Sequence, residues 1–228
     1  MWSTCIEEAT SGERRIGAIL QRYRGGVIRP RFSDLAVGLW EKLTIRAAIV
    51  AGSRRANRFD SFGRGSLICF PPTALFGEKA ISIGADTIIG PHCSISVGMV
   101  PDQELIGERM LVIGDRCVIG RGSSIAAHLS VTIGDDVYFG PNVYVTDHNH
   151  SNDDPTIPVG RQASPEQEVV IGARSWLATG VVVTPGVTIG EGVSVGANSV
   201  VTRDLPDGCT AAGAPARILS LGPQQNAD

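Results

Sequence analysis

The sequence is poor in aromatic residues and in cysteine, and both shortages restrict its fold. Aromatic side chains make up 5% of the 228 residues, although 43% of the residues are hydrophobic. An apolar core with so few rings must be narrow and lined by branched aliphatic side chains. The five cysteines are scattered without a C-x-x-C pair, which argues against a disulfide framework and a thiolate zinc site. A reducing compartment is therefore expected.

Long apolar segments are also missing. The longest, Leu35–Gly52, is interrupted by Glu41, Lys42 and Arg46, and is too short and too charged to span a bilayer. Residues Met1–Thr10 contain no apolar region typical of a signal peptide. We therefore expect a soluble cytoplasmic protein, acting in the cytosol or at the inner membrane surface. The H-E-x-x-H motif and the P-loop do not occur either, which removes two common kinds of catalytic site.

Positive charge is concentrated at the start of the chain. Residues 1–65 contain twelve Lys/Arg and six Asp/Glu, whereas the remainder is acidic and brings the net charge to -3. We expect two helices in this basic segment, over residues 12–24 and 34–51, the second capped by Ser33. The segment either makes a peripheral contact with anionic lipid or docks one helix face on the rest of the protein, which we prefer. Nucleic-acid binding is not expected of it.

The sequence does contain a six-residue repeat. Over residues 169–203, branched aliphatic residues stand six positions apart, and a small residue follows most of them. Neither an α-helix nor an ordinary β-strand has this period, whereas a fixed repeat is typical of a stacked solenoid. An ordinary β-sandwich would need this spacing to arise by coincidence. The aliphatic positions are Ile171, Leu177, Val183, Ile189, Val195 and Val201.

Six residues can form one short strand and one turn, so three repeats close a triangular coil. The aliphatic side chains then stack on those of the coils above and below, as in other solenoids. The spacing first appears at Ile83 and is interrupted at residues 98–112 and 151–168, which we expect to be extruded loops, the second a functional lid. Two extra residues also stand between Ile125 and Ile133.

These features divide the chain into three parts. We expect a mainly helical segment over residues 1–65, a β-solenoid with a short C-terminal return over residues 66–218, and a frayed tail over residues 219–228. The role of the first part does not follow from its composition.

Histidine is scarce, since the sequence contains only four. His148 and His150 fall in Val-Thr-Asp-His-Asn-His, directly before the second loop. A histidine at a strand end beside a polar loop is suited to act as a general base, because its pKa lies near neutrality. The same two residues project to one side of an extended strand, so they suit metal binding with His128 as a third ligand. A pair of surface histidines is the third alternative.

Longer motifs in the last third of the sequence are similar to those of one known family. Residues 169–218 contain Val-Ile-Gly-x-x-x-Trp-Leu, Thr-Pro-Gly-Val-Thr-Ile-Gly, Val-Gly-Ala-Asn-Ser-Val-Val-Thr-Arg-Asp and Ala-Gly-Ala-Pro-Ala-Arg. Together they resemble the hexapeptide-repeat acyltransferases, within the branch of maltose, galactoside and xenobiotic acetyltransferases. The resemblance spans residues 83–218. It implies a left-handed parallel β-helix and a homotrimer with active sites between subunits. Crossovers between parallel strands are otherwise right-handed, so only the resemblance implies the handedness.

The resemblance also implies acetyl-CoA as the acyl donor, bound along the last coils, with no metal required. Motif positions place aromatic and small residues beside the pantetheine arm, and threonine and arginine at the nucleotide and its phosphates. A second basic position near Ser220 is missing, so weaker phosphate binding is expected. The residues assigned to coenzyme A are Trp176, Ala178, Thr179, Ala197, Thr202, Arg203 and Arg217.

His148 matches the general base of this family, which deprotonates the acceptor hydroxyl as it attacks the thioester. Its neighbours Asp147, Asn149 and His150 are expected to bind the acceptor. Maltose and galactoside acetyltransferases carry an acceptor-side asparagine two coils earlier, where this chain has Arg-Gly-Ser-Ser at 121–124. The Asp-His-Asn-His motif instead resembles transferases that O-acetylate surface polysaccharides or their precursors.

Our leading hypothesis is therefore a CoA-dependent O-acetyltransferase acting on a sugar or a cell-envelope glycan precursor. N-acetylation of an amino sugar is a variant of it, since a histidine base suits either nucleophile. A metal enzyme like the γ-carbonic anhydrases, which share the fold, is the alternative from another class. A scaffold without activity is the third. The sequence does not reveal the acceptor, the acyl length or the donors to the oxyanion.

Overall fold

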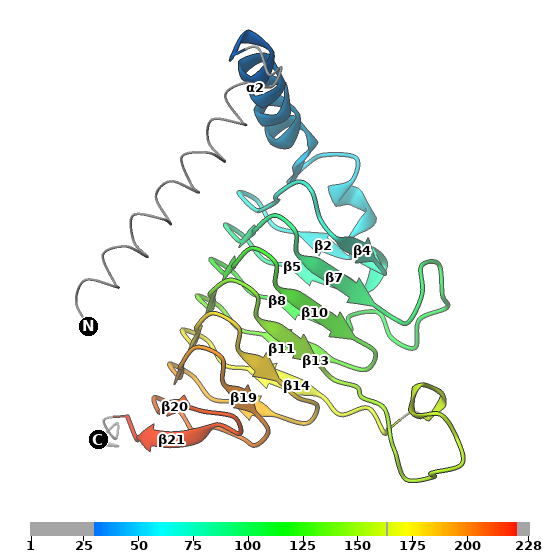
Figure 1. Cartoon of the computed structure of the whole chain (residues 1–228), viewed down its shortest axis with the longest axis vertical. Coiled ribbons are helices and arrows are strands. Elements are labelled where there is room, and N and C mark those ends of the chain that lie inside the picture. The colour runs from blue at the N-terminus through cyan, green and yellow to red at the C-terminus, as the bar shows by residue number, and fades with distance from the viewer. Residues whose placement is uncertain (1–29, 163, 223–228) are drawn as a thin grey trace, which may run out of the picture. The chain divides into compact units, whose positions relative to one another are not determined.

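The computed structural model describes residues 30–162 and 164–222 (Figure 1). The helix expected over residues 12–24 lies outside this part of the chain. Two compact units, Met1–Leu43 and Thr44–Asp228, make up the chain, and each is described by itself.

Helix α2 (Pro30–Ala47) lies at the boundary of these units and differs from its predicted range of 34–51. It begins at a proline, which is favoured in the first helical turn, so Ser33 is not its N-cap. It ends early because Ile49 and Val50 form strand β1, whose buried Ile49 pairs with Ile68. Among the described residues, no helix combines the length and the apolarity needed to cross a membrane.

From Thr44 onwards the chain runs through three sheets in turn, so that every third strand pairs in parallel (Figure 1). This arrangement is a parallel β-helix, as the repeat predicted. We name the sheets A, B and C. Sheet A contains β1 (Ile49–Val50), β3 (Leu67–Ile68), β6 (Ile88–Ile89), β9 (Val118–Ile119), β12 (Tyr138–Phe139), β15 (Trp176–Leu177), β18 (Ser194–Val195), β20 (Thr210–Ala212) and β21 (Arg217–Ser220).

The other two sheets have six strands each. Sheet B contains β2 (Ser61–Phe62), β5 (Ile81–Ile83), β8 (Leu111–Ile113), β11 (Val131–Ile133), β14 (Val169–Ile171) and β17 (Thr188–Ile189). Sheet C contains β4 (Ala74–Phe76), β7 (Ser94–Val97), β10 (Ser124–Ala127), β13 (Tyr144–Thr146), β16 (Val182–Val183) and β19 (Val200–Val201). Short 3-10 helices η1 (Ala56–Arg58), η2 (Glu78–Ala80) and η3 (Val159–Arg161) lie in the connections.

The register of the sheets explains the six-residue repeat. In sheet B, Ile83 pairs with Ile113, Ile113 with Ile133, and so on through Ile171 to Ile189, so the same side-chain type stacks in every coil. These residues are almost fully buried inside the β-helix. Each coil therefore buries its apolar side chains against its neighbours, and the core continues as long as the repeat does.

The boundaries of the β-helix differ from the predicted ones. Strand β2 already pairs in parallel with β5, so the coils begin before residue 66. The first extruded loop occupies residues 98–110, because β8 starts at Leu111, and the second connection already leaves the coil after Thr146. At the other end, β21 turns back antiparallel to β20, which is the expected C-terminal return.

Candidate active site at one edge of the β-helix

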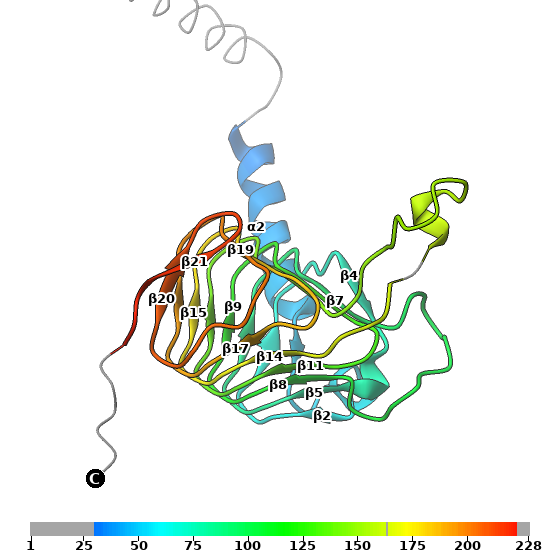
Figure 2. The same cartoon turned by 90° about the horizontal axis from the view of Figure 1, so that it is seen from below.

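The carboxyl ends of the sheet C strands form one edge of the β-helix, and the histidines of interest lie there. These strands are all parallel and paired in register, so the residues that follow them stack coil upon coil. His128 follows β10, Asp147 and His148 follow β13, and Thr202 follows β19 by one residue. Both extruded loops also leave from this edge (Figure 2).

Asp147 is the structural centre of this edge. Its side chain is fully buried, and its carboxylate accepts hydrogen bonds from three consecutive backbone N–H groups. Those of Leu129 and Ser130 lie 2.7 and 2.8 Å from Oδ2, and that of His128 lies 2.9 Å from both oxygens. A carboxylate that leaves water needs such donors to offset the cost of burial. The negative charge is therefore fixed in place behind the next residue, His148.

The His148 ring is oriented by this carboxylate. Its Nδ1 lies 2.9 Å from Oδ1 of Asp147 and 3.0 Å from the Thr146 hydroxyl. A carboxylate can only accept, so the ring proton belongs on Nδ1, and Nε2 keeps its lone pair. The side chain is 23% exposed, which leaves it reachable from solvent. A histidine held this way can take a proton from a substrate, and the adjacent carboxylate stabilises the charge that results.

His128 packs against the other side of the base. Its ring lies parallel to that of His148, with the centroids 3.4 Å apart and 3° between the planes. The Nδ1 of His128 lies 3.5 Å from the carboxylate of Glu166, which belongs to the second extruded segment. Burial, and next the charge of His148, lowers the pKa of His128 below its usual value. A neutral His128 therefore stacks on the base without adding a second positive charge.

The sequence contains a signal for this arrangement. The two extra residues between Ile125 and Ile133 lengthen the turn after β10, and this turn supplies the N–H groups that hold Asp147. The irregular spacing is visible in the sequence, but its connection with Asp147 is not. Placing the two together needs the register of β10 on β13, in which Ile125 pairs with Val145.

Other predicted acceptor residues lie further out. Asn149 and His150 are exposed at the start of the second segment, where the Asn149 side chain accepts a hydrogen bond from the His150 N–H. The Nδ1 of His150 lies 3.3 Å from the carbonyl oxygen of Gln162, in the returning part of the same segment. Asp147 cannot contact an acceptor, because its buried oxygens face the backbone and His148.

The set of three histidines considered for metal binding does not converge. The rings of His128 and His148 are stacked face to face, so their nitrogen lone pairs lie in parallel planes rather than pointing at one position. Within residues 30–162 and 164–222, no group of three or more His, Cys, Asp or Glu side chains is placed to hold a metal ion.

The residues assigned to coenzyme A lie on different parts of the coil. Thr202 and Arg203 are exposed on the same edge as His148, two sheet C strands further along. The others belong to sheet A or to the edge that follows it, so one protomer does not gather the whole set around His148. Trp176 is half-exposed in β15, Ala178 and Thr179 follow that strand, Ala197 lies in the turn after β18, and Arg217 begins β21.

Comparison with known proteins identifies the class. A family model described as bacterial transferase hexapeptide (six repeats) matches residues 168–203, and a hexapeptide repeat of succinyl-transferase matches residues 110–147. A relative in Escherichia coli K12, named "Putative lipopolysaccharide biosynthesis O-acetyl transferase WbbJ", is 37% identical over 57% of this chain and 69% of its own. The chain therefore belongs to the hexapeptide-repeat acyltransferase family and is an acyltransferase, as the motifs predicted.

Other relatives with related names and a related fold are also similar to this chain. The galactoside O-acetyltransferase of Escherichia coli K12 is 28% identical over 87% of each chain. The colanic acid biosynthesis acetyltransferase WcaF of the same organism, also named as putative, is 33% identical over 64% of this chain and 70% of its own. Among solved structures, the N-acyltransferase AntD from Bacillus cereus, complexed with dTDP and 3-hydroxybutyryl-CoA, has a TM-score of 0.62. The match covers 75% of this chain and 87% of the AntD chain at 22% identity, which shows a shared fold.

Proposed function

We propose that the protein is an acetyl-CoA-dependent O-acetyltransferase whose acceptor is a hydroxyl of a cell-envelope glycan or its precursor. The observation that carries the proposal is the Asp147–His148 pair, a solvent-accessible histidine whose Nδ1 is held by a buried carboxylate. The names of the relatives support the substrate class, because they refer to lipopolysaccharide, colanic acid and galactosides. The solved relatives with coenzyme A or an acyl-CoA support the donor.

The chemistry requires one proton to move twice. His148 Nε2 accepts the proton of the acceptor hydroxyl while its oxygen attacks the thioester carbonyl of acetyl-CoA. The tetrahedral intermediate collapses, the carbon–sulfur bond breaks, and the protonated histidine returns the proton to the leaving thiolate. General base catalysis of this kind contributes roughly 10²–10⁴-fold to the rate. The acyl group is transferred directly, with no covalent enzyme intermediate.

Asp147 acts as a positioning residue in this mechanism. Its contacts fix the tautomer of His148, and its charge stabilises the imidazolium that forms during transfer. This role replaces the acceptor contact expected from the sequence. His128 limits the motion of the His148 ring by stacking on it, while Asn149 and His150 remain our candidates for the acceptor side.

Coenzyme A is proposed to lie between copies of the chain. The base lies on the edge after sheet C, whereas Trp176, Ala178, Thr179 and Ala197 belong to sheet A or the edge after it. In a trimer of left-handed β-helices, as in the resembled family, the edge after sheet A of one subunit lies against the edge after sheet C of the next. Thr202, Arg203 and Arg217 then provide the polar and cationic groups for the nucleotide and phosphates.

Isotopically labelled acetyl-CoA tests this function. The full-length protein is incubated with labelled donor and native glycan extract, and mass spectrometry locates the label. We expect an acetyl ester, which mild base removes. A base-stable amide would instead indicate N-acetylation of an amino sugar. Absence of label from every glycan, while a known acetyltransferase of the same extract transfers it, would contradict the proposal.

Because apolar side chains of helix α2 are exposed, we further propose, against the preference stated from the sequence, that the part of the chain before Thr44 makes a peripheral contact with an anionic membrane surface. In helix α2, Phe32, Leu35, Leu39 and Leu43 recur at helical spacing, and each is between about half and 70% exposed. Apolar side chains of this kind, next to an excess of Arg and Lys, are typical of helices that lie in a membrane interface. Flotation with anionic and with neutral vesicles tests the contact, and equal recovery with both would contradict it.

A further inference from the structure

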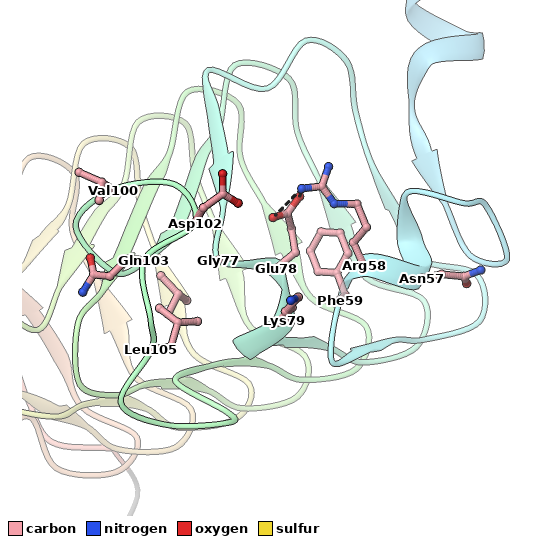
Figure 3. Close-up of a pocket in the computed structure, with 11 residues that line it drawn as sticks. Asn57, Arg58, Phe59, Gly77, Glu78, Lys79, Val100, Asp102, Gln103 and Leu105 are labelled. Carbon is pink, nitrogen blue, oxygen red and sulfur yellow. Dashed lines mark hydrogen bonds and ion pairs between the residues drawn. The ribbon is translucent and has the colours of Figure 1, made fainter.

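A cavity with polar and apolar walls lies near the same edge, on the side of the first coils. Its volume is about 650 Å³, within the range of roughly 300–1,000 Å³ for small-molecule sites. One wall comes from η1 and η2, and the other from the first extruded loop, as Figure 3 shows. Nothing in the mechanism above uses this cavity.

The walls carry side chains suited to hydroxyl groups. Glu78 is 8% exposed and pairs with Arg58 at 3.2 Å, so a planar carboxylate and a planar guanidinium lie together on one wall (Figure 3). Asp102 lies opposite them on the loop, and Gln103 also lines the cavity, with its side-chain oxygen accepting the Met99 N–H of the same loop at 2.8 Å. These groups both donate and accept hydrogen bonds in fixed planes, which is what a polyhydroxylated ligand requires.

The charges in the cavity balance. Among the described residues of the lining, Arg58 and Lys79 are opposed by Glu78 and Asp102. Phosphate or nucleotide sites instead concentrate positive charge and charge-assisted donors. The lining also includes apolar surface from Phe59. A neutral ligand with hydroxyl groups and an apolar face therefore fits this chemistry better than an anion.

The cavity is connected to the candidate active site through the loop. Gln103 and Leu105 line it and also line a smaller pocket of about 80 Å³ that reaches His128 and Glu166. Val97, on the rim, ends β7, which is two strands from β13 in sheet C. Strands stack about 4.8 Å apart, so the rim lies about 10 Å from the level of His148 along the coil axis. A ligand longer than one sugar ring can bridge that separation.

We propose that this cavity is a subsite for the non-reacting part of a neutral oligosaccharide acceptor. The proposal rests on the proposed function, since it assigns the acceptor of that same site. The oligosaccharide extends along the edge from His148, where its hydroxyl is acetylated, to the wall formed by Glu78 and Arg58. The first extruded loop covers it, and Asp102 binds it from that side.

Two variants with a matched control test the subsite in the full-length protein. Binding of neutral di- to tetrasaccharides of galactose, glucose, mannose and rhamnose is measured by saturation-transfer NMR. We expect at least one to bind, and Asp102→Ala and Glu78→Gln each to raise its Kd roughly tenfold through loss of a charge-assisted hydrogen bond. The control is Glu104→Ala, which removes one negative charge from the same loop at a residue that does not line the cavity. We expect this variant to bind the oligosaccharide with the wild-type Kd. Melting temperatures of all variants monitor folding.

The outcomes separate this proposal from the proposed function. Failure of every neutral oligosaccharide to bind, preference for phosphorylated sugars, or equal Kd values for Asp102→Ala and Glu104→Ala would overturn the subsite. Acetyl transfer is measured in the same samples. Transfer that is insensitive to both cavity variants removes the subsite alone. Binding that depends on Asp102 and Glu78 but is never followed by transfer keeps the subsite and removes the proposed function.

Discussion

Replacing Asp147 with asparagine separates the positioning of His148 from the stability of the fold. The amide can present only one oxygen to the donors that now surround the carboxylate. With that oxygen in place of Oδ2, it still accepts the N–H groups of His128, Leu129 and Ser130. The amide NH₂ group then replaces Oδ1, which faces Nδ1 of His148 at 2.9 Å and shares the His128 N–H with Oδ2, so that shared contact is lost. The reverse orientation sets NH₂ against three N–H groups and is much less favourable.

This geometry inverts the tautomer of the base. An NH₂ group at the Oδ1 position donates, so Nδ1 of His148 must accept, and the ring proton moves to Nε2. The nitrogen that should take the acceptor proton then has no lone pair. We expect kcat to fall by about 10²–10⁴-fold, the full contribution of a general base. Stability should fall by only about 1–3 kcal/mol, because the retained hydrogen bonds lose their charge assistance.

The assay compares acetyl transfer at saturating acetyl-CoA for Asp147→Asn, Asp153→Asn and the wild type. Asp153 belongs to the same segment but is exposed, with its carboxylate bonded to the Ser151 hydroxyl, so its variant controls for loss of charge. Urea denaturation measures stability in parallel. A folded Asp147→Asn protein with wild-type kcat would refute the assigned role, and so would an equal loss in Asp153→Asn.

Three further outcomes follow from particular side chains. Burial lowers the pKa of His128 below 6.5, so as the pH falls the unfolded chain protonates this histidine before the folded protein does. The free energy of unfolding that a neutral His128 contributes is therefore complete above about pH 6.5 and is lost progressively below it. His128 faces His148, Asp147 and Glu166, and His128→Phe should keep the stacking while flattening the decline of the melting temperature between pH 7 and about 5; an unchanged slope would count against this. Phe139→Ala, at a position with 0% exposure, should cost about 3–5 kcal/mol in urea denaturation, and a loss below about 1 kcal/mol would show that the core is not closely packed there. Arg203→Ala should raise the KM for acetyl-CoA roughly tenfold with kcat nearly unchanged, whereas an unaltered KM would remove Arg203 from the cofactor site.

The parallel β-helix could be predicted from the sequence because each six-residue repeat corresponds to one strand and one turn of a coil. Ile171, Val183 and Ile189 are separated by multiples of six residues, and a coil of three short strands brings such positions to the inside. The end of helix α2 could not be predicted in this way. Leu35, Leu39 and Leu43 suggest a helix of any length, and the antiparallel pairing of Ile49 with Ile68, which ends it, is a tertiary contact that local pattern does not contain.

Of the candidate site, the sequence indicated one residue, His148, but not the side chains and backbone groups that surround it. His148 was predicted from its motif and its place before a loop. Its partners depend on coil register: the turn at His128–Ser130 and the side chain of Asp147 are about twenty positions apart in sequence. The cavity beside Glu78 could not be predicted for the same reason, since η1, η2 and the first loop meet there only after folding.

His148 is proposed to act as the base in acyl transfer and not as a structural residue. His148→Ala tests this role most directly when transfer from acetyl-CoA and calorimetric binding of coenzyme A are measured on the same preparation. We predict that transfer falls at least 10²-fold while the Kd for coenzyme A stays within about twofold of the wild-type value. Undiminished transfer by a folded His148→Ala protein would contradict the account.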